Sequence, residues 1–286
     1  MSISAQSEEM PQWNESYEYL YGMNVTDASG DILPEAPLSA EYLRAGIIVE
    51  IINGMPSSDT CMLMFLLNGH LQPFYLDDQK YAYITSPIEG NGQISYYVRF
   101  DELFLTDCQI NYLQIVTVGL VDVLPDDEND PIDHYMNSVT IPFFSDEFAN
   151  TYVPVSTAEY ALPTGIVNKR CDDYCQLDFY TEIGDEQITY PPFVQYLTAD
   201  ACSFHIIATG KYNMMQMLVV CDGIPQVNED LSLDCFYLKY SYGYESCFTP
   251  ENLSIGSHQV FAIAYPIYNM SWFSASTPKI SFSITQ

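Results

Sequence analysis

The hydrophobic and polar positions along this chain form short runs that either alternate or stay apolar throughout. Glycine, asparagine, aspartate and proline separate these runs, which is typical of β-strands joined by tight turns. Helical periodicity is confined to residues 40–44 and 156–161, each long enough for only a turn or two. The pattern predicts an all-β protein.

Five strand-like segments of residues 46–144 match five segments of residues 201–284 in the same order. The matched pairs are 46–52 with 202–207, 62–72 with 215–226, 94–100 with 235–240, 112–118 with 257–263, and 139–143 with 280–284. Two unrelated β domains of similar composition are the alternative. The shared order and the shared glycine turns favour an internal duplication.

The second matched pair carries the clearest turn signal. Asn68-Gly69 and Asp222-Gly223 each end an apolar run, and each is followed three residues later by a glutamine, Gln72 or Gln226. Asn-Gly and Asp-Gly are the strongest short-range hairpin signals because both central turn positions need positive φ. We expect a β-hairpin at both places.

Two copies are too few for a solenoid, so each copy must close on itself. Units of roughly 85 to 100 residues in short strands suit an immunoglobulin-like sandwich. We therefore predict two tandem Ig-like antiparallel β-sandwich domains that arose by internal duplication. Residues 46–148 form the first sandwich and 201–286 the second; residues 1–45 form an N-terminal extension with an extra strand, and 149–200 a linker with edge strands.

The extension and the linker each contain a strand candidate, at residues 17–21 and 176–180. The simplest interpretation is that each strand covers an edge of its own sandwich, which protects that edge from aggregation. The alternative is that the N-terminal segment adds as a strand to a neighbouring molecule.

Charge narrows the class of partner. The chain has 38 acidic and 8 basic residues, for a formal net charge of −30. This surface repels phosphates and anionic lipids, which argues against nucleic acid and membranes as partners, and it attracts cations or a basic protein. Charged residues make up only 16% of the chain and hydrophobic residues 48%, a composition typical of an ordered protein.

No run of 18 apolar residues is present, so we expect no membrane insertion. Residues 1–9 have neither the charged region nor the apolar region of a secretory signal. The chain is therefore either cytoplasmic or an extracellular protein whose signal is not visible.

The eight cysteines permit full pairing and are consistent with an oxidising compartment, but they do not recur at matching positions in the two copies. Cys171 and Cys175 form the one close pair, for which a disulfide, free thiols and zinc all remain open. Their three-residue spacer differs from a redox motif, and no second close pair completes a zinc site. Cys221 aligns with Leu67, which indicates a small buried hydrophobic residue.

An acidic loop supplies the one metal candidate. Asp126, Glu128 and Asp130 alternate as the oxygen ligands of a calcium loop do. The loop is not an EF-hand, because Pro131 stands at the sixth position and Asn137 at the twelfth. A solvated turn is the alternative, and no other cofactor is expected.

Signals of catalysis are absent from the sequence. The four histidines stand apart, and no zinc-protease, nucleophile-elbow or P-loop motif occurs. The adjacent carboxylates Asp77-Asp78 and Asp185-Glu186 mean little in so acidic a chain. We expect no enzyme; a hydrolase would need a concave pocket with a coupled acid and base.

The repeated strand, Asn/Asp-Gly turn and glutamine, together with the acidic balance, resemble tandem Ig-like modules of secreted or cell-surface bacterial proteins. That resemblance implies a spacer, adhesive or assembly module with a protein partner or self-assembly. We therefore expect a non-catalytic extracellular or cell-surface protein that binds or assembles through sandwich faces, edges and loops. The alternative is an acidic intracellular decoy that occupies a basic nucleic-acid-binding protein.

Overall fold

The structure is a computed structural model, and the regular secondary structure of its described residues is almost entirely β-strand. They comprise 21–33, 37–106, 110–119, 121, 136–145, 166–167, 176–183, 186–189, 193–198, 203–210, 213–238, 243–250, 253–267, 275–277 and 279–285. Among them the one α-helix is α1 (Ala40–Ala45), at the predicted helical turn. The second predicted turn, 156–161, lies outside the described residues.

The first half of the chain forms two sheets. Its strands are β1 (Tyr21–Asp27), β2 (Leu38–Ser39), β3 (Ile47–Asn53), β4 (Asp59–Leu67), β5 (His70–Leu71), β6 (Phe74–Leu76), β7 (Gln79–Tyr81), β8 (Tyr83–Ile88), β9 (Gly92–Arg99), β10 (Ile110–Val118) and β11 (Met136–Phe144). The first outer sheet has the order β1-β3-β9-β6-β7. The first inner sheet has the order β2-β11-β10-β4-β5, with β8 also paired to β4.

The second half also forms two sheets. Its strands are β12 (Ile166–Val167), β13 (Gln176–Ile183), β14 (Glu186–Thr189), β15 (Phe193–Thr198), β16 (Phe204–Thr209), β17 (Asn213–Cys221), β18 (Ile224–Gln226), β19 (Asp234–Leu238), β20 (Gly243–Phe248), β21 (Gly256–Pro266), β22 (Ala275–Ser276) and β23 (Ile280–Thr285). The second outer sheet has the order β12-β20-β16-β13-β14. The second inner sheet has the order β15-β23-β21-β17-β18, with β19 paired to β17 and β22 to β21.

The pairing is that of an Ig-like sandwich in both halves, which confirms the predicted fold class. In the first half, β1, β3, β9 and β6 pair as strands A, B, E and D do, while β4, β10 and β11 pair as strands C, F and G do. In the second half, β13, β16 and β20 repeat the A-B-E order, and β17, β21 and β23 repeat C-F-G. The residue limits of the two domains stay a prediction.

The duplication extends to the short strands. A parallel strand closes each inner sheet, with β2 beside β11 in the first half and β15 beside β23 in the second. The strand predicted at residues 176–180 is present as β13, and it pairs with β16 as β1 pairs with β3. Each half therefore uses its own N-terminal segment as a strand of its own outer sheet.

One matched pair of the sequence comparison is wrong. Residues 94–100 fall mainly in β9, which pairs with β3 in an outer sheet, whereas the segment from Cys235 falls in β19, which pairs with β17 in an inner sheet. The topological counterpart of β9 is β20, and that of β19 is β8. Both segments are rich in aromatic residues, which suit any half-buried strand and do not specify its neighbour.

Both predicted hairpins are present. Asn68 and Gly69 have φ values of 50° and 84°, and Asp222 and Gly223 have φ values of 50° and 71°. Positive φ at both central residues defines the type I′ turn, whose twist matches that of the strands it joins. The turns connect β4 to β5 and β17 to β18.

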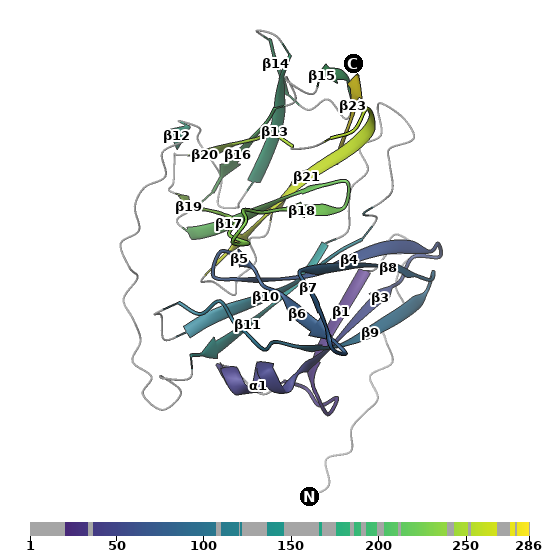
Figure 1. The fold of residues 1–286 in the computed structure, drawn as a ribbon, viewed down its shortest axis with the longest axis vertical. Helices are drawn as coiled ribbons and strands as arrows, with labels where there is room; N and C mark the ends of the chain where they lie inside the picture. Colours follow the sequence, from purple (N-terminus) through teal and green to yellow (C-terminus); the bar gives the residue numbers. More distant parts are fainter. Residues whose placement is uncertain are drawn as a thin grey trace, which may run out of the picture.

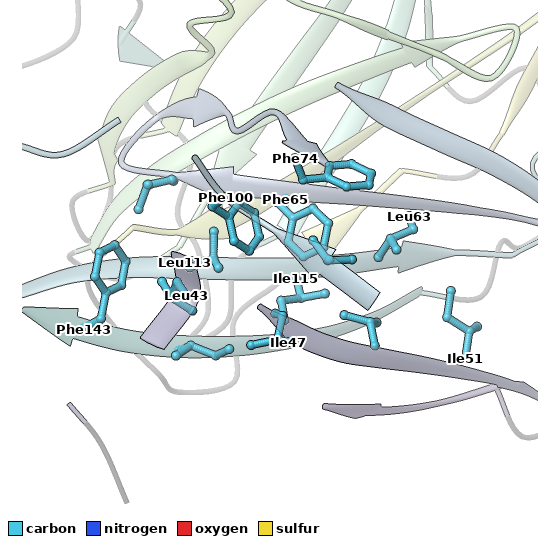
Figure 2. Packing of buried hydrophobic residues seen from close by; sticks show 14 of the residues in the cluster. Leu43, Ile47, Ile51, Leu63, Phe65, Phe74, Phe100, Leu113, Ile115 and Phe143 are labelled. Carbon is cyan, nitrogen blue, oxygen red and sulfur yellow. The ribbon is translucent and has the colours of Figure 1, made fainter. Parts of the chain in front are cut away.

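Each sandwich has its own hydrophobic core between its two sheets. In the first, Phe65 lies edge-on to Phe74 and Phe100, with ring centroids 4.7 Å and 5.0 Å apart (Figure 2). Leu43 of α1 is fully buried in the same core, so the helix closes one end of the sandwich. In the second core, Phe204 packs edge-on against Phe282 at 4.9 Å.

A third hydrophobic cluster, the interface cluster, joins the two sandwiches. Its buried members come from both inner sheets and their adjoining turns: Met62, Met64, Leu66, Leu71, Val116, Val118, Val121, Leu218, Val220, Leu233, Phe261, Ile263 and Tyr265. Figure 1 shows the second sandwich above the first, with β17 and β18 facing β4 and β5. The four sheets are therefore stacked as outer, inner, inner, outer, and both inner sheets are covered on two faces.

Backbone hydrogen bonds also cross between the sandwiches. The Leu71 nitrogen donates to the Leu231 carbonyl at 2.9 Å, and the Leu233 nitrogen donates to the Gly69 carbonyl at 2.8 Å. His70 and Ser232 form an antiparallel bridge between these bonds. The edge of the first inner sheet at β5 is thus sealed by the second sandwich, which removes an exposed strand edge.

Candidate interaction surface

An apolar row crosses the outward face of the first outer sheet. Ile32 is bridged to Thr26, Thr26 is paired with Ile48, and Ile48 is paired with Tyr97. Residues paired across strands place their side chains on the same face. Ile32 is 89% exposed and Tyr97 45% exposed, so this row, here called the Ile32–Tyr97 row, offers apolar surface to solvent.

The sequence of β3 explains why the row is apolar. Along β3 buried and half-buried residues alternate, with Ile47, Val49 and Ile51 in the core. Ile48 therefore points outward, and Glu50 is the one charged residue of the strand. An ordinary half-buried strand would carry polar residues at most of these outward positions.

Tyr97 is held in place by the chain that enters β3. Its hydroxyl donates to the Ala45 carbonyl at 2.6 Å, and its ring lies over Gly46. Gly46 has a φ of 107°, and a Cβ there would lie 2.6 Å from the Tyr97 ring. Only glycine fits this position, and the close fit fixes the orientation of the tyrosine.

A tight turn presents Ile32. One carboxylate oxygen of Asp27 accepts hydrogen bonds from the Ser29 and Asp31 nitrogens at 2.8 Å and 2.9 Å. Its other oxygen accepts from the Tyr42 hydroxyl at 3.0 Å. These hydrogen bonds hold the pKa of Asp27 below its usual value, and the bond from the Asp31 backbone has the largest effect. The turn is therefore most rigid when Asp27 is ionised.

The neighbouring charges on this sheet are already engaged. Glu50 accepts a hydrogen bond from the Asn24 amide at 2.8 Å. Arg99 lies 3.3 Å from a carboxylate oxygen of Asp78 and donates to the Asp77 carbonyl at 3.0 Å. The exposed Arg99–Asp78 ion pair contributes little to stability, and the Glu50 carboxylate keeps its negative charge because its hydrogen-bond partner is a neutral amide.

The second outer sheet presents a different, polar face. His205 of β16 lies opposite Cys247 of β20, and its Nδ1 lies 3.0 Å from a carboxylate oxygen of Glu245. The Cys247 sulfur lies 2.9 Å from the Ser203 hydroxyl. The duplication has therefore preserved the strand order but not the outer surface.

His258 has a structural role. Its Nδ1 lies 2.6 Å from Asp222 Oδ2, and its Nε2 donates to the Ser254 carbonyl at 2.8 Å. Asp222 Oδ1 also accepts from the Gln259 nitrogen at 2.9 Å. This network links the second hairpin turn to β21, as expected for a structural histidine in a strand whose two ring nitrogens both have hydrogen-bond partners.

The residues predicted to bind calcium, Asp126, Glu128 and Asp130, lie outside the described residues. So do Cys171 and Cys175, the close cysteine pair. Among the residues that the structure describes, no three His, Cys, Asp or Glu side chains are grouped to hold a metal ion. Of the adjacent carboxylates, Asp77 and Asp78 lie in the turn between β6 and β7, where Asp78 is fully exposed, and Asp185 is not described.

None of the four described cysteines forms a disulfide. Cys61 and Cys221 are buried in the separate cores of the two sandwiches, so Cys221 is the buried hydrophobic residue that its alignment with Leu67 predicted. Cys235 is exposed as a residue, but its sulfur packs against Gly69 of the first sandwich. Burial raises the pKa of the Cys235 thiol to about 11.

In the described part of the chain, no helix is both long and apolar enough to span a membrane.

Sequence reasoning missed the Ile32–Tyr97 row. One signal was present, because the run from Ile47 to Ile52 is apolar on both faces except at Glu50. The contribution of Ile32 could not be foreseen, since it lies in a turn-rich segment and joins the row only through its bridge to Thr26.

No protein-family model matches the chain, and no curated protein matches its sequence. Among solved structures, the chain is similar to a SafA pilin in complex with the SafB chaperone from Salmonella enterica. The two share 11% sequence identity with a TM-score of 0.28, and the match covers 93% of this chain and 97% of that chain. The chaperone YadV shares 7% identity over 90% of this chain and 98% of its own, with a TM-score of 0.26. The C-terminal domain of the AgI/II polypeptide BspA from Streptococcus agalactiae shares 8% identity over 92% of this chain and all of its own, also with a TM-score of 0.26.

Proposed function

We propose that this chain is a non-catalytic interaction protein that binds a protein partner through the outward face of its first outer sheet. The observation that carries the proposal is the Ile32–Tyr97 row, which combines a highly exposed isoleucine with a half-exposed tyrosine on a rigid sheet. Exposed apolar groups on a preorganised surface, with tyrosine among them, are typical of binding sites.

The row is rigid before any partner arrives. Tyr97 is held by its hydrogen bond to Ala45 and its contact with Gly46, and the backbone that carries Ile32 is held by the Asp27 turn and by its bridge to Thr26. A surface whose side chains are already ordered loses less conformational entropy on binding. This arrangement suits recognition better than catalysis, which needs an acid or base facing a reacting group.

The net charge selects the kind of partner. At −30 the chain attracts cationic surfaces over a distance of about 8 Å at physiological salt. A partner with an apolar contact and a basic rim fits both properties, and nucleic acid and anionic membranes do not. We place the protein outside the cell or at the cell surface, and secretion is tested by fractionating the producing cells.

The proposal is tested by site-specific photo-crosslinking in the cells that produce the chain. A photoreactive phenylalanine analogue replaces Ile32 in one variant and Ile255 in the control. Ile255 is 63% exposed and lies in the second sandwich, away from the row. We expect a crosslinked product from position 32 and none from position 255.

The mass of the product identifies the partner class. A product containing only this 32.5 kDa chain twice would show self-assembly through the row, and one containing a basic protein would show a separate partner. A nucleic-acid-binding protein as the sole product would support the acidic decoy instead. No product at position 32, or equal products at both positions, would overturn the assignment of this surface.

A further inference from the structure

We infer that Asn24 is a modification site that carries an N-linked glycan. The inference rests on the proposed location outside the cell, because such glycans are attached to chains that enter the secretory route. It concerns the polar residues beside the Ile32–Tyr97 row and does not depend on which partner that row binds.

The acceptor triplet is Asn24-Val25-Thr26, in the middle of β1. N-linked glycans are attached to the asparagine of Asn-x-Ser or Asn-x-Thr, where x is any residue except proline. Among the asparagines that the structure describes, Asn24 alone has serine or threonine two residues after it. Three further triplets begin at Asn14, Asn252 and Asn269, outside the described residues. A triplet of this kind also occurs by chance, so its place in the fold decides whether it can be used.

The fold leaves the Asn24 side chain accessible. Asn24 is exposed, whereas Asn53 and Asn111 are fully buried. In the described part of the first outer sheet, β1 is an edge strand with β3 on one side only. Asn24 and Thr26 are two positions apart on this strand, so both side chains point to the same outward face. A glycan on Asn24 therefore projects into solvent and displaces no core residue.

The residues beside Asn24 are polar. Asn24 is paired with Glu50, and Glu50 is paired with Ser95, which is exposed. This polar row lies next to the Ile32–Tyr97 row, about 7 Å away along β1, since Asn24 and Thr26 are two strand positions apart. A bulky, hydrated glycan suits such a row and the open edge of β1, which it shields from pairing with another chain. The glycan would thus border the proposed binding surface.

The hydrogen bond that Asn24 makes is compatible with the modification. Its side-chain nitrogen donates to Glu50 Oε2 at 2.8 Å. An amide nitrogen carries two hydrogens and glycosylation replaces one of them, so one N–H remains to donate. During synthesis Glu50 follows Asn24 by 26 residues, so the acceptor amide emerges before its partner.

The transfer balances with one co-reactant, a lipid-diphosphate-linked oligosaccharide of the secretory membrane. The Asn24 side-chain nitrogen forms a bond to the anomeric carbon of the first sugar and gives up one proton to a base of the transferase. The bond between that carbon and the diphosphate oxygen breaks, and the lipid diphosphate leaves with the electron pair. Neither an oxidant nor a reductant is needed.

The inference is tested by peptide mapping of the full chain, purified from each fraction of the cells that produce it. Peptide N-glycosidase in heavy-oxygen water removes each glycan and converts its asparagine to an aspartate that carries the heavy oxygen. We expect this label at Asn24 and none at Asn228, whose exposed amide also donates a hydrogen bond but which has Asp230 two residues after it. A chain that is outside the cell with Asn24 unlabelled would overturn the inference and leave the proposed location intact. A chain found only in the cytosol would overturn the location, and the inference with it.

Two substitutions at the third position of the triplet test whether the triplet is read. Thr26→Val keeps the shape of the side chain but removes the hydroxyl, whereas Thr26→Ser keeps an acceptor triplet. We expect Asn24 to keep its label in Thr26→Ser and to lose it in Thr26→Val. A labelled Asn24 in Thr26→Val would overturn the inference, and the map of the unchanged chain decides the matter where a variant does not fold.

Discussion

Cys61 and Cys221 serve the two cores as small apolar residues, and neither thiol is suited to chemistry. Burial raises the pKa of Cys61 to about 12, with the neighbouring Asp59 carboxylate adding to the rise and a hydrogen bond with Tyr21 opposing it. A thiol held in its neutral form is a poor nucleophile. The reactive cysteine of the described residues should instead be sought at the exposed Cys247.

The raised pKa of Cys61 predicts a loss of stability in alkali. The unfolded thiol ionises near pH 9, whereas the folded thiol keeps its proton to about pH 12. The stabilisation is therefore complete below pH 9 and is lost as the pH rises through 12, at up to about 1.4 kcal/mol per pH unit. Denaturant midpoints of the wild type and Cys61→Ala, measured from pH 7 to pH 11, should converge above pH 9. Parallel curves across that range would contradict the assignment.

The two hairpins share one turn type but differ in their surroundings. A Cβ on Gly69 would lie 2.4 Å from the Cys235 sulfur, whereas a Cβ on Gly223 would lie 3.1 Å from the nearest Val121 methyl carbon. Both glycines have positive φ, so alanine at either costs about 1 kcal/mol from the backbone alone. Each turn therefore meets the other sandwich, and the contact at Gly69 is the tighter of the two.

We expect Gly69→Ala to destabilise the protein more than Gly223→Ala. The extra loss of stability comes from the collision of the new methyl group with the Cys235 sulfur. Adding Cys235→Ala to Gly69→Ala should therefore recover much of that extra loss, whereas adding Cys235→Ala to Gly223→Ala should recover none. Urea denaturation of the single and double variants measures this coupling. Equal losses at the two glycines, or no recovery with Cys235→Ala, would show that the turn does not meet the second sandwich as described.

The hairpins also show what the sequence could predict. Asn68-Gly69 and Asp222-Gly223 were recognised because the turn signal is local and depends on backbone conformation at two residues. The strands that pair with β9 and β19 could not be predicted, because alternating aromatic residues suit a strand in either sheet. The predicted calcium ligands Asp126, Glu128 and Asp130 remain predictions.

The contact between the two sandwiches shows most clearly what the sequence does not predict. Gln114 and Gln259 each donate a side-chain hydrogen bond to a backbone carbonyl of the other sandwich, but nothing in either segment indicates that the side chain reaches that far. An apolar residue in a strand that is covered on both faces looks the same whether it faces its own core or a neighbouring domain. Long-range docking is a property of two assembled surfaces.

At the scale of the whole molecule, the interface cluster should make the two sandwiches unfold together. Ile263 is fully buried and contributes to this cluster and to neither core. A charge there is buried without a partner, so Ile263→Asp should separate the sandwiches and split one calorimetric transition into two. Ser95→Asp, at an exposed position of β9, is the control and should leave a single transition. One transition in Ile263→Asp would show that the sandwiches are not coupled through this cluster.

The paired inner sheets impose an order on synthesis. The first sandwich leaves the ribosome with one face of its inner sheet bare, because the strands that cover it end at residue 266. From Val118 to Tyr265 the ribosome must add 147 residues, which takes roughly 7 to 30 s at ordinary elongation rates. During that interval Met62, Met64, Val116 and Val118 are not covered by the second inner sheet. The nascent chain, more than the finished protein, is the form in which these residues are open to aggregation.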